Sequence, residues 1–115
     1  METLNNFLTS FARGSFLRSQ YYFDDSYVFN LVFFINDLKE NWSEKFSTNF
    51  PDKDELLFEN WYIGKGEYSE NILKIPLRLF CADGFVDITS YINYSKSNKL
   101  FQIHIDSWGG LGNEE

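Results

Sequence analysis

Cysteine is almost absent from this chain of 115 residues, because Cys81 is the only one. A single thiol cannot form an internal disulfide, and with only one histidine in the chain we expect no zinc site. The start of the sequence, METLNNFLTSFARG, also lacks the basic residues and the continuous apolar run of a secretion signal. We therefore expect a cytoplasmic protein in a reducing compartment.

Long hydrophobic runs are missing as well. The longest, Leu31 to Ile35, is far shorter than the roughly 20 residues that a membrane-spanning helix needs, so we expect no membrane association. Motifs for cofactors are also lacking. Asp52-Lys53-Asp54-Glu55 is too short for a calcium-binding loop and has no glycine, and Gly64-Lys65-Gly66 lacks most of a phosphate-binding loop. We expect no cofactor, no metal and no catalytic motif, and we interpret residues 64–66 as a turn or bulge.

Basic residues are outnumbered, with 10 Lys and Arg against 17 Asp and Glu, a net charge of -7 and a pI near 4.6. Direct nucleic-acid binding depends on the opposite charge, so it is disfavoured. A negative surface speeds the encounter with a basic protein. The alternative is that the acidity serves only solubility.

Aromatic residues are abundant, with 13 Phe, 7 Tyr and 3 Trp. A hydrophobic content of 43% is enough for one core, so we expect residues 1–115 to form a single domain. A buried ring removes about 150–250 Å² from water. A domain of this size cannot bury every ring, and rings that remain at the surface favour binding.

The first half of the chain has the periodicity of helices. Leu4, Phe7, Leu8 and Phe11 follow the spacing of one buried stripe, with Thr3 as the expected N-cap and Gly14 as the expected end. A second helix is expected at residues 27–42, capped by residues 24–26. Its inner part, residues 27–35, is also compatible with a strand because it is rich in aromatic and β-branched residues. A short helix is expected at residues 52–58, behind Pro51.

From Asn60 onward the pattern has the period of two that is typical of strands. It predicts three antiparallel strands in a meander, preceded by a fourth at residues 60–68. Turns are expected at Asp83-Gly84 and at residues 95–98, and a flexible tail is expected from Gly109. The aliphatic face must be covered by the N-terminal helices, which makes the fold class α+β. The positions expected on this nearly all-aliphatic face are Leu73, Ile75, Leu77, Leu79, Cys81, Val86, Ile88, Ser90, Ile92, Phe101, Ile103 and Ile105.

The opposite face of the predicted sheet carries the polar side chains. The expected turns place Arg78 opposite Thr89, Thr89 opposite His104, and Asp87 opposite Asp106. Such a cluster could use His104 as a general base, or it could be the ordinary solvated side of an antiparallel sheet. Cys81 belongs to the aliphatic face and is expected to point away from His104. Thr89 shares this face, and the candidate residues of this second surface are Arg78, Asp87, Tyr91, His104, Asp106 and Trp108.

Acidic and aromatic residues are interleaved between residues 37 and 70. Rings provide contact area and carboxylates steer a cationic partner, so this stretch is a candidate partner-binding surface. Alternatively, it is a solvated connection with core-facing tryptophans. The candidate residues are Glu44, Asp52, Asp54, Glu55, Glu59, Trp61, Tyr62, Glu67, Tyr68 and Glu70.

In size, acidity, low cysteine content and helix-then-sheet order, the chain resembles the small immunity proteins of bacterial contact-dependent growth inhibition and related toxin systems. The segment ILKIPLRLFCADGFVDITSYINYSKSNKLFQIHIDSW is similar in style to the sheets of several such proteins. The resemblance implies an intracellular, non-catalytic protein that binds a cognate toxin domain, often a basic nuclease, and blocks its active site.

The order of helices and meander, beginning with NNFLTSFARGSF, also resembles the cone-shaped fold named after nuclear transport factor 2. That fold hosts enzymes and pure binders, so it implies no single activity. It does imply an alternative function, a small-ligand-binding or hydrolytic domain that uses His104, Asp87 and Asp106. A regulatory protein-interaction module is a third hypothesis.

Overall fold

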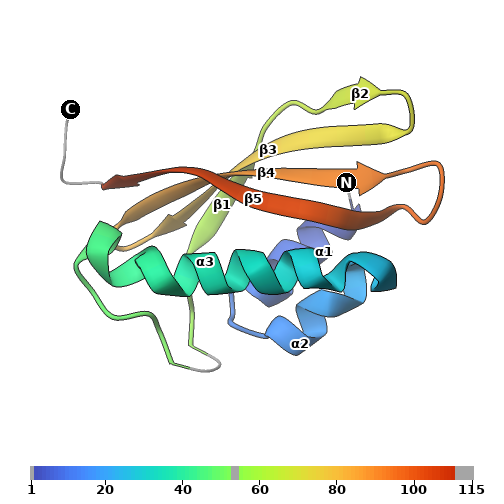
Figure 1. Ribbon diagram of the computed structural model, residues 1–115. Coiled ribbons are helices and arrows are strands. Elements are labelled where there is room, and N and C mark those ends of the chain that lie inside the picture. Colours follow the sequence, from blue (N-terminus) through green and yellow to red (C-terminus); the bar gives the residue numbers. More distant parts are fainter. Residues whose placement is uncertain (1, 53–54, 111–115) are drawn as a thin grey trace.

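The computed structural model describes residues 2–52 and 55–110 and shows an α+β fold, with helices first and an antiparallel sheet afterwards (Figure 1). The predicted fold class is confirmed. Two short 3-10 helices, Gln20–Tyr22 and Asp25–Tyr27, connect the second and third α-helices. The elements are α1 (Glu2–Phe11), α2 (Phe16–Ser19), α3 (Val28–Phe46), β1 (Asn60–Ile63), β2 (Glu67–Ser69), β3 (Ile72–Cys81), β4 (Gly84–Asn93) and β5 (Lys99–Gly110).

Helix α1 buries the stripe that its spacing predicts, including Leu4 and Phe11. The helix already includes Glu2, so Thr3 lies in its first turn and is not the N-cap that we expected. Gly14 follows with a φ of 75°, a conformation that glycine adopts without steric cost, and its N–H donates to the carbonyl of Phe11. The chain therefore turns where the sequence predicted.

Helix α3 settles the choice between helix and strand at residues 27–35 in favour of the helix. It buries Leu31, Ile35 and Leu38 on one face, whereas Val32 is exposed. Asp24 is the N-cap of the 3-10 helix that precedes α3, because its side chain accepts a hydrogen bond from the Ser26 N–H at 2.9 Å. The helix continues to Phe46, beyond the expected end at Trp42, because Trp42 and Phe46 are both buried on the same face.

The strand order is β1-β3-β4-β5, and β2 pairs with the same edge of β3 as β1 does. The single strand expected at residues 60–68 is divided into β1 and β2 by residues 64–66, where a turn or bulge was predicted. The turn between β3 and β4 consists of Ala82 and Asp83, because Cys81 pairs with Gly84. The expected turn at Asp83-Gly84 was therefore wrong by one residue, and Arg78 lies opposite Asp87 instead of Thr89.

Two β-bulges shift the register between β4 and β5. Thr89 lies opposite His104 as predicted, but the bulge beside Asp87 pairs this residue with Ser107 instead of Asp106. The same bulge moves Trp108 to the helix side, and the second bulge makes Leu100 a core residue in place of Phe101. The predicted assignments of Trp108 and Phe101 to faces of the sheet were wrong for this reason.

Two further predictions concern the loops and the C-terminus. Residues 55–58 are not helical, so the expected helix at 52–58 does not form there, and residues 53–54 lie outside the described residues. Gly109 and Gly110 belong to β5 and pair with Phe85 and Gly84, so the tail does not begin at Gly109. Residues 111–115 lie outside the described residues.

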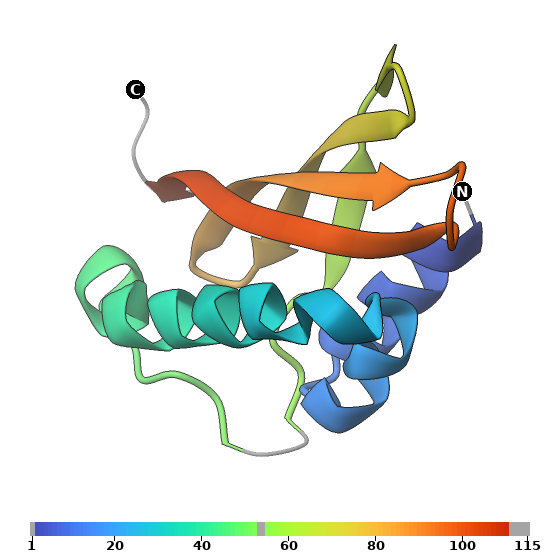
Figure 2. The same cartoon turned by 45° about the vertical axis from the view of Figure 1, so that its right-hand side comes forward.

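All helices lie on one side of the sheet, as Figures 1 and 2 show from two directions. One continuous hydrophobic core fills the space between the two layers and includes Phe7, Phe11, Phe23 and Phe58. The opposite face of the sheet has no helix over it within the described part of the chain. None of the helices in residues 2–52 and 55–110 has the length and apolar character needed to cross a bilayer.

Candidate functional site

The uncovered face of the sheet carries an ion pair between β3 and β4, close to the turn that joins them. Arg78 on β3 donates to Asp87 on β4 through two hydrogen bonds, with Nε–Oδ1 at 2.7 Å and Nη2–Oδ2 at 3.0 Å. The guanidinium also lies over the ring of Phe85, 3.9 Å from its centroid. The hydrogen bond with Asp87 raises the pKa of Arg78. Both members of the pair are thus engaged within the protein.

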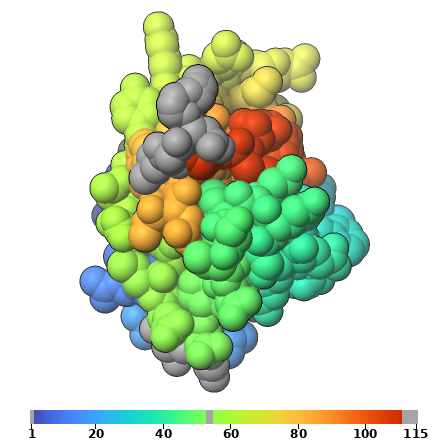
Figure 3. All heavy atoms as spheres, turned by 90° about the vertical axis from the view of Figure 1, so that its left-hand side faces the viewer, coloured from blue at the N-terminus to red at the C-terminus, as the bar shows by residue number. Residues whose placement is uncertain are grey.

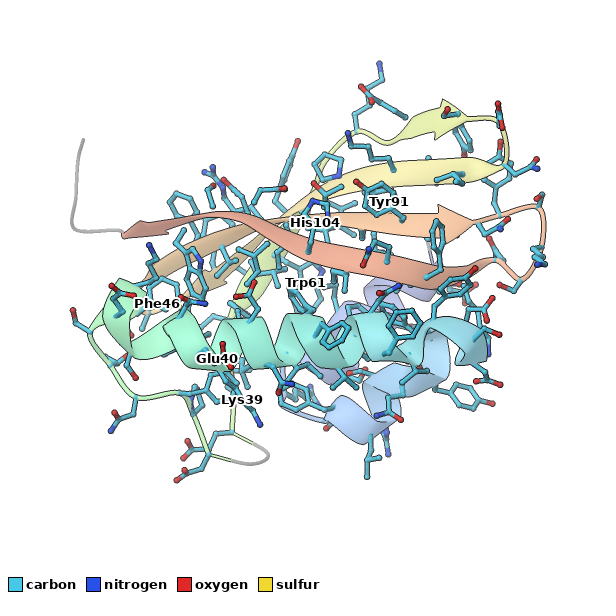
Figure 4. All side chains as sticks on the ribbon, in the orientation of Figure 1. Lys39, Glu40, Phe46, Trp61, Tyr91 and His104 are labelled. Carbon is cyan, nitrogen blue, oxygen red and sulfur yellow. The ribbon has the colours of Figure 1, made fainter. Side chains whose placement is uncertain are left out.

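A second polar group lies next to this pair, on β4 and β5. His104 Nε2 is 3.0 Å from Asp106 Oδ1, and Thr89 Oγ1 donates to Asp106 Oδ2 at 2.6 Å. The ring of Tyr91 lies beside the imidazole, with centroids 5.8 Å apart. Figure 4 shows His104 and Tyr91 close together on the sheet. The sequence predicted this grouping, although the bulge pairs Asp87 with Ser107 and not with Asp106.

The geometry of this group gives limited support for catalysis. The side chain of His104 is 47% exposed, and the surface around it is an open hollow. Cys81 is buried on the helix side of the sheet, so it is not a nucleophile for this imidazole, and burial raises the pKa of its thiol. Within residues 2–52 and 55–110, no group of three or more His, Cys, Asp or Glu is arranged to hold a metal ion.

The acidic and aromatic residues predicted for partner binding lie at two separate ends of β3. Glu55 and Glu59 line an open recess of about 460 Å³ together with Asp83, at the end where β3 turns into β4. Glu67 and Tyr68 lie on β2, which pairs with the opposite end of β3, and Glu70 follows β2 directly. The structure therefore does not gather the whole stretch into one patch.

The remaining predicted residues are distributed as follows. Glu44 is exposed on α3, and Asp52 is exposed in the segment after it. Trp61 packs against the core between the sheet and α3 (Figure 4), whereas Tyr62 is 66% exposed. Asp54 lies outside the described residues.

The recess occupies the end of the molecule shown in Figure 3, where the last turns of α3, the segment after them and the β3–β4 turn meet. Thr48 donates a hydrogen bond to Asp83 Oδ2 at 2.8 Å and ties two of its walls together. Trp42 also lines the recess, and its buried Nε1 has no hydrogen-bond partner among the described residues.

A feature that the sequence analysis missed is a row of neighbouring rings, here called the aromatic ladder. It begins on α3, crosses the edge of β5 and ends on the uncovered face of the sheet. Consecutive ring centroids are 6.2, 6.2, 5.7, 6.1 and 5.8 Å apart. In order, its members are Phe33, Phe29, Tyr27, Phe101, Tyr91 and His104.

The sequence did contain a signal for the first part of the ladder. Phe29 and Phe33 are four residues apart and fall outside the helical stripe formed by Leu31, Ile35 and Leu38. An apolar pair off the buried stripe of a helix is expected to face solvent. The contribution of Phe101 could not be found in this way, because it depends on a bulge.

Most carboxylates of the described residues form no ion pair with a cation of residues 2–52 and 55–110. The ion pairs recorded within residues 2–52 and 55–110 are those of Asp87 with Arg78 and of Asp106 with His104. Exposed carboxylates without such a pair occur on α3, in the recess and near β2. Their charge is available to a partner.

Comparisons with protein-family models, curated proteins and solved structures found no match for this chain. The resemblances to immunity proteins and to the cone-shaped fold therefore remain hypotheses that rest on the sequence alone.

Proposed function

We propose that this protein is a non-catalytic inhibitor that binds and neutralises a basic partner protein. In the form implied by the resemblance, it is a cytoplasmic immunity protein and its partner is a cognate toxin domain such as a nuclease. The observation that carries the proposal is the surplus of exposed carboxylates that form no ion pair within residues 2–52 and 55–110. Such charges cost stability through mutual repulsion, and a cationic partner removes that cost.

The surface supplies the other requirement of a protein-binding domain, which is contact area. Large exposed apolar side chains such as Tyr27, Phe29 and Phe33 are present beside the charges. Rings anchor an interface, whereas charges around it mainly set the rate of encounter and the choice of partner. A nucleic-acid ligand fits this surface poorly, since phosphates would be repelled.

A second candidate function is the binding or hydrolysis of a small ligand on the uncovered face of the sheet. It is favoured by the His104–Asp106–Thr89 hydrogen-bonded group and by the hollow beside it, which Tyr91 and Lys74 also line. It is disfavoured by the openness of that hollow, because catalytic sites gain much of their effect by excluding water. A regulatory interaction module with no toxin partner would use the same surface properties as the inhibitor.

The test is binding to purified proteins encoded by the neighbouring genes, followed by an assay of whatever activity the bound protein has. The proposal predicts a complex with a basic protein and loss of that protein's activity on titration with this chain. Thr89→Val, which removes the hydrogen bond to Asp106 without removing a ring, serves as the control variant and should bind and inhibit like the wild type. The absence of a complex with any co-encoded protein, together with a small-molecule activity that His104→Ala abolishes, would favour the second candidate. A complex without inhibition would favour the regulatory module.

A further inference from the structure

We propose that the aromatic ladder, together with the carboxylates that follow it along α3, is the docking surface for a basic, amphipathic segment of the partner protein. This inference rests on the proposed function and assigns partner binding to one surface of the protein. It differs from the surface predicted from the sequence, because that stretch is divided between two ends of the sheet.

The first three rings of the ladder contribute little to the core. Phe33 is 66% exposed, Phe29 is 52% exposed, and Tyr27 is 42% exposed. Single exposed apolar residues are common, but rings in contact with one another form a continuous apolar patch. Val32, also exposed, extends this patch on α3. A surface of this kind is typical of an interface that becomes buried on binding.

Hydrogen bonds between the start of α3 and the edge of β5 hold the two halves of the ladder together. The Nδ2 of Asn30 donates to the carbonyl of Phe101 at 2.7 Å, and the N–H of Asp24 donates to the carbonyl of Leu100 at 2.7 Å. Phe23, fully buried, forms a β-bridge with Leu100 beside them. The rings are therefore positioned before a partner arrives, which reduces the entropy lost on binding.

The charge next to the ladder indicates what kind of partner fits. Asp37, Glu40 and Glu44 are exposed and continue the side of α3 that carries Phe29 and Phe33, since these positions recur at three- and four-residue intervals. Asp25 is exposed just before the helix. The partner should thus place apolar groups on the rings and cations on the carboxylates.

The lysines of α3 do not neutralise this side of the helix. The Nζ of Lys39 lies over the rings of Phe16 and Phe50, 5.9 and 5.8 Å from their centroids. Figure 4 shows Lys39 on the side of α3 away from the sheet, and neighbouring residues of a helix such as Lys39 and Glu40 point about 100° apart. Lys45 lies on a different side of the helix from Glu40 and Glu44, as its position in the helical repeat requires.

Helix geometry also limits the length of the occupant. Phe29 and Glu44 are separated by about 22 Å along the axis, at about 1.5 Å per residue. A partner helix of about 15 residues, or a shorter extended segment, covers this distance. A second copy of this chain fits poorly, because two such surfaces would bring Asp37 and Glu40 of both copies together.

The experiment uses the full chain and three synthetic helical peptides of about 18 residues, a length that spans the surface. One carries Leu and Lys on separate faces, the second replaces Leu by Ser, and the third replaces Lys by Glu. We expect the Leu/Lys peptide to bind, and the other two to bind at least about tenfold more weakly. Amide shifts in the NMR spectrum should change at Asn30, Phe33 and Gln102.

Matched variants test whether peptide binding depends on this surface or on another part of the protein. Phe29→Ser with Phe33→Ser should weaken binding of the Leu/Lys peptide by about tenfold or more, because it removes two anchoring rings. Tyr62→Ser with Tyr68→Ser removes rings of similar exposure, 66% and 69%, and should leave binding unchanged. Asp37→Asn with Glu40→Gln should weaken binding of this peptide a few-fold. Glu55→Gln with Glu59→Gln serves as its control and should not weaken binding in this way. Circular dichroism confirms that each variant is folded.

Three results would overturn the inference. Shift changes confined to the recess around Glu55 and Glu59, with a co-encoded basic protein still bound, would refute the docking surface and leave the proposed function intact. Failure of every basic peptide and every co-encoded protein to bind would refute both. A concentration-dependent dimer in sedimentation experiments that Phe29→Ser with Phe33→Ser abolishes would show that a second copy occupies the ladder.

Discussion

Arg78 and Asp87 are direct neighbours across β3 and β4 and form a two-bond ion pair, with Nε–Oδ1 at 2.7 Å and Nη2–Oδ2 at 3.0 Å. The pair depends on a turn made of Ala82 and Asp83, since a turn one residue later would separate the two side chains. It lies over Phe85, whose ring in turn lies against Gly109 of β5. Three strands are thus linked through this contact.

Replacing Asp87 by Ala should lower the free energy of unfolding by about 1 kcal/mol, because both partners are partly exposed and water weakens their attraction. Urea denaturation of the wild type, Asp87→Ala, Arg78→Ala and the double variant measures the coupling between the two residues. We expect a coupling of about 0.5–1 kcal/mol that decreases at about 1 M salt. Strictly additive losses would show that the ion pair does not stabilise the fold.

Phe11 and Phe33 should respond very differently to the same substitution. Phe11 is completely buried and contacts the rings of Phe7, Phe34 and Phe58, so Phe11→Ala should cost about 3–5 kcal/mol. Phe33→Ala should change stability by less than about 0.5 kcal/mol, because its ring already faces solvent. Urea denaturation measures both, and Phe11→Leu serves as a milder core variant. A large loss in Phe33→Ala would show that the ladder is needed for folding and would weaken the case for binding.

Gly109→Ala tests the close approach of β4 and β5. A Cβ at this position would overlap the ring of Phe85, and the guanidinium of Arg78 packs on the same ring, 3.9 Å from its centroid. We expect a loss of about 1–3 kcal/mol, with faster hydrogen exchange at Phe85 and Val86. In a Phe85→Ala background the same substitution should cost much less, since the overlap is gone. Equal costs in both backgrounds would contradict this account.

The sheet could be predicted from the sequence in its outline but not in its register. Alternation at Leu73, Ile75 and Leu77 is enough to assign the buried face of β3, because a strand has two faces and one must be covered. A bulge adds one residue to one strand and leaves no clear trace in the alternation. For this reason Trp108 was assigned to the wrong face, although it packs against Trp42 and Phe46.

The helices, like the strands, could be predicted where local sequence determines them and could not be predicted where tertiary contacts determine them. Helix α1 follows from its own spacing. Helix α2 has four residues, too few for local propensity to predict, and tertiary contacts hold it in place. One of these contacts is the buried pair of Ser10 and Ser19, whose Oγ atoms are 3.1 Å apart. The aromatic ladder was missed for a related reason, because it joins α3 to β5 across the sequence.

Cys81 should make stability depend on alkaline pH. Burial raises the pKa of its thiol in the folded state, whereas in the unfolded chain a thiol has a pKa of about 8.5. Above about pH 8.5 the unfolded state therefore binds fewer protons than the folded state, and the free energy of unfolding falls as the pH rises. Urea denaturation at about pH 7 and about pH 9.5 should show a larger loss in the wild type than in Cys81→Ala. Equal losses would show that the thiol is not protected by the fold.

The central claim is that exposed carboxylates and rings bind a basic protein. The most direct measurement is the kinetics of binding to the co-encoded protein, by stopped-flow fluorescence at salt concentrations from about 50 mM to about 500 mM. The account predicts that the association rate constant falls by about tenfold or more over this range, because screening removes the electrostatic attraction. It also predicts that Phe29→Ser with Phe33→Ser mainly increases the dissociation rate constant. An association rate constant that does not depend on salt, or the lack of any complex, would contradict it.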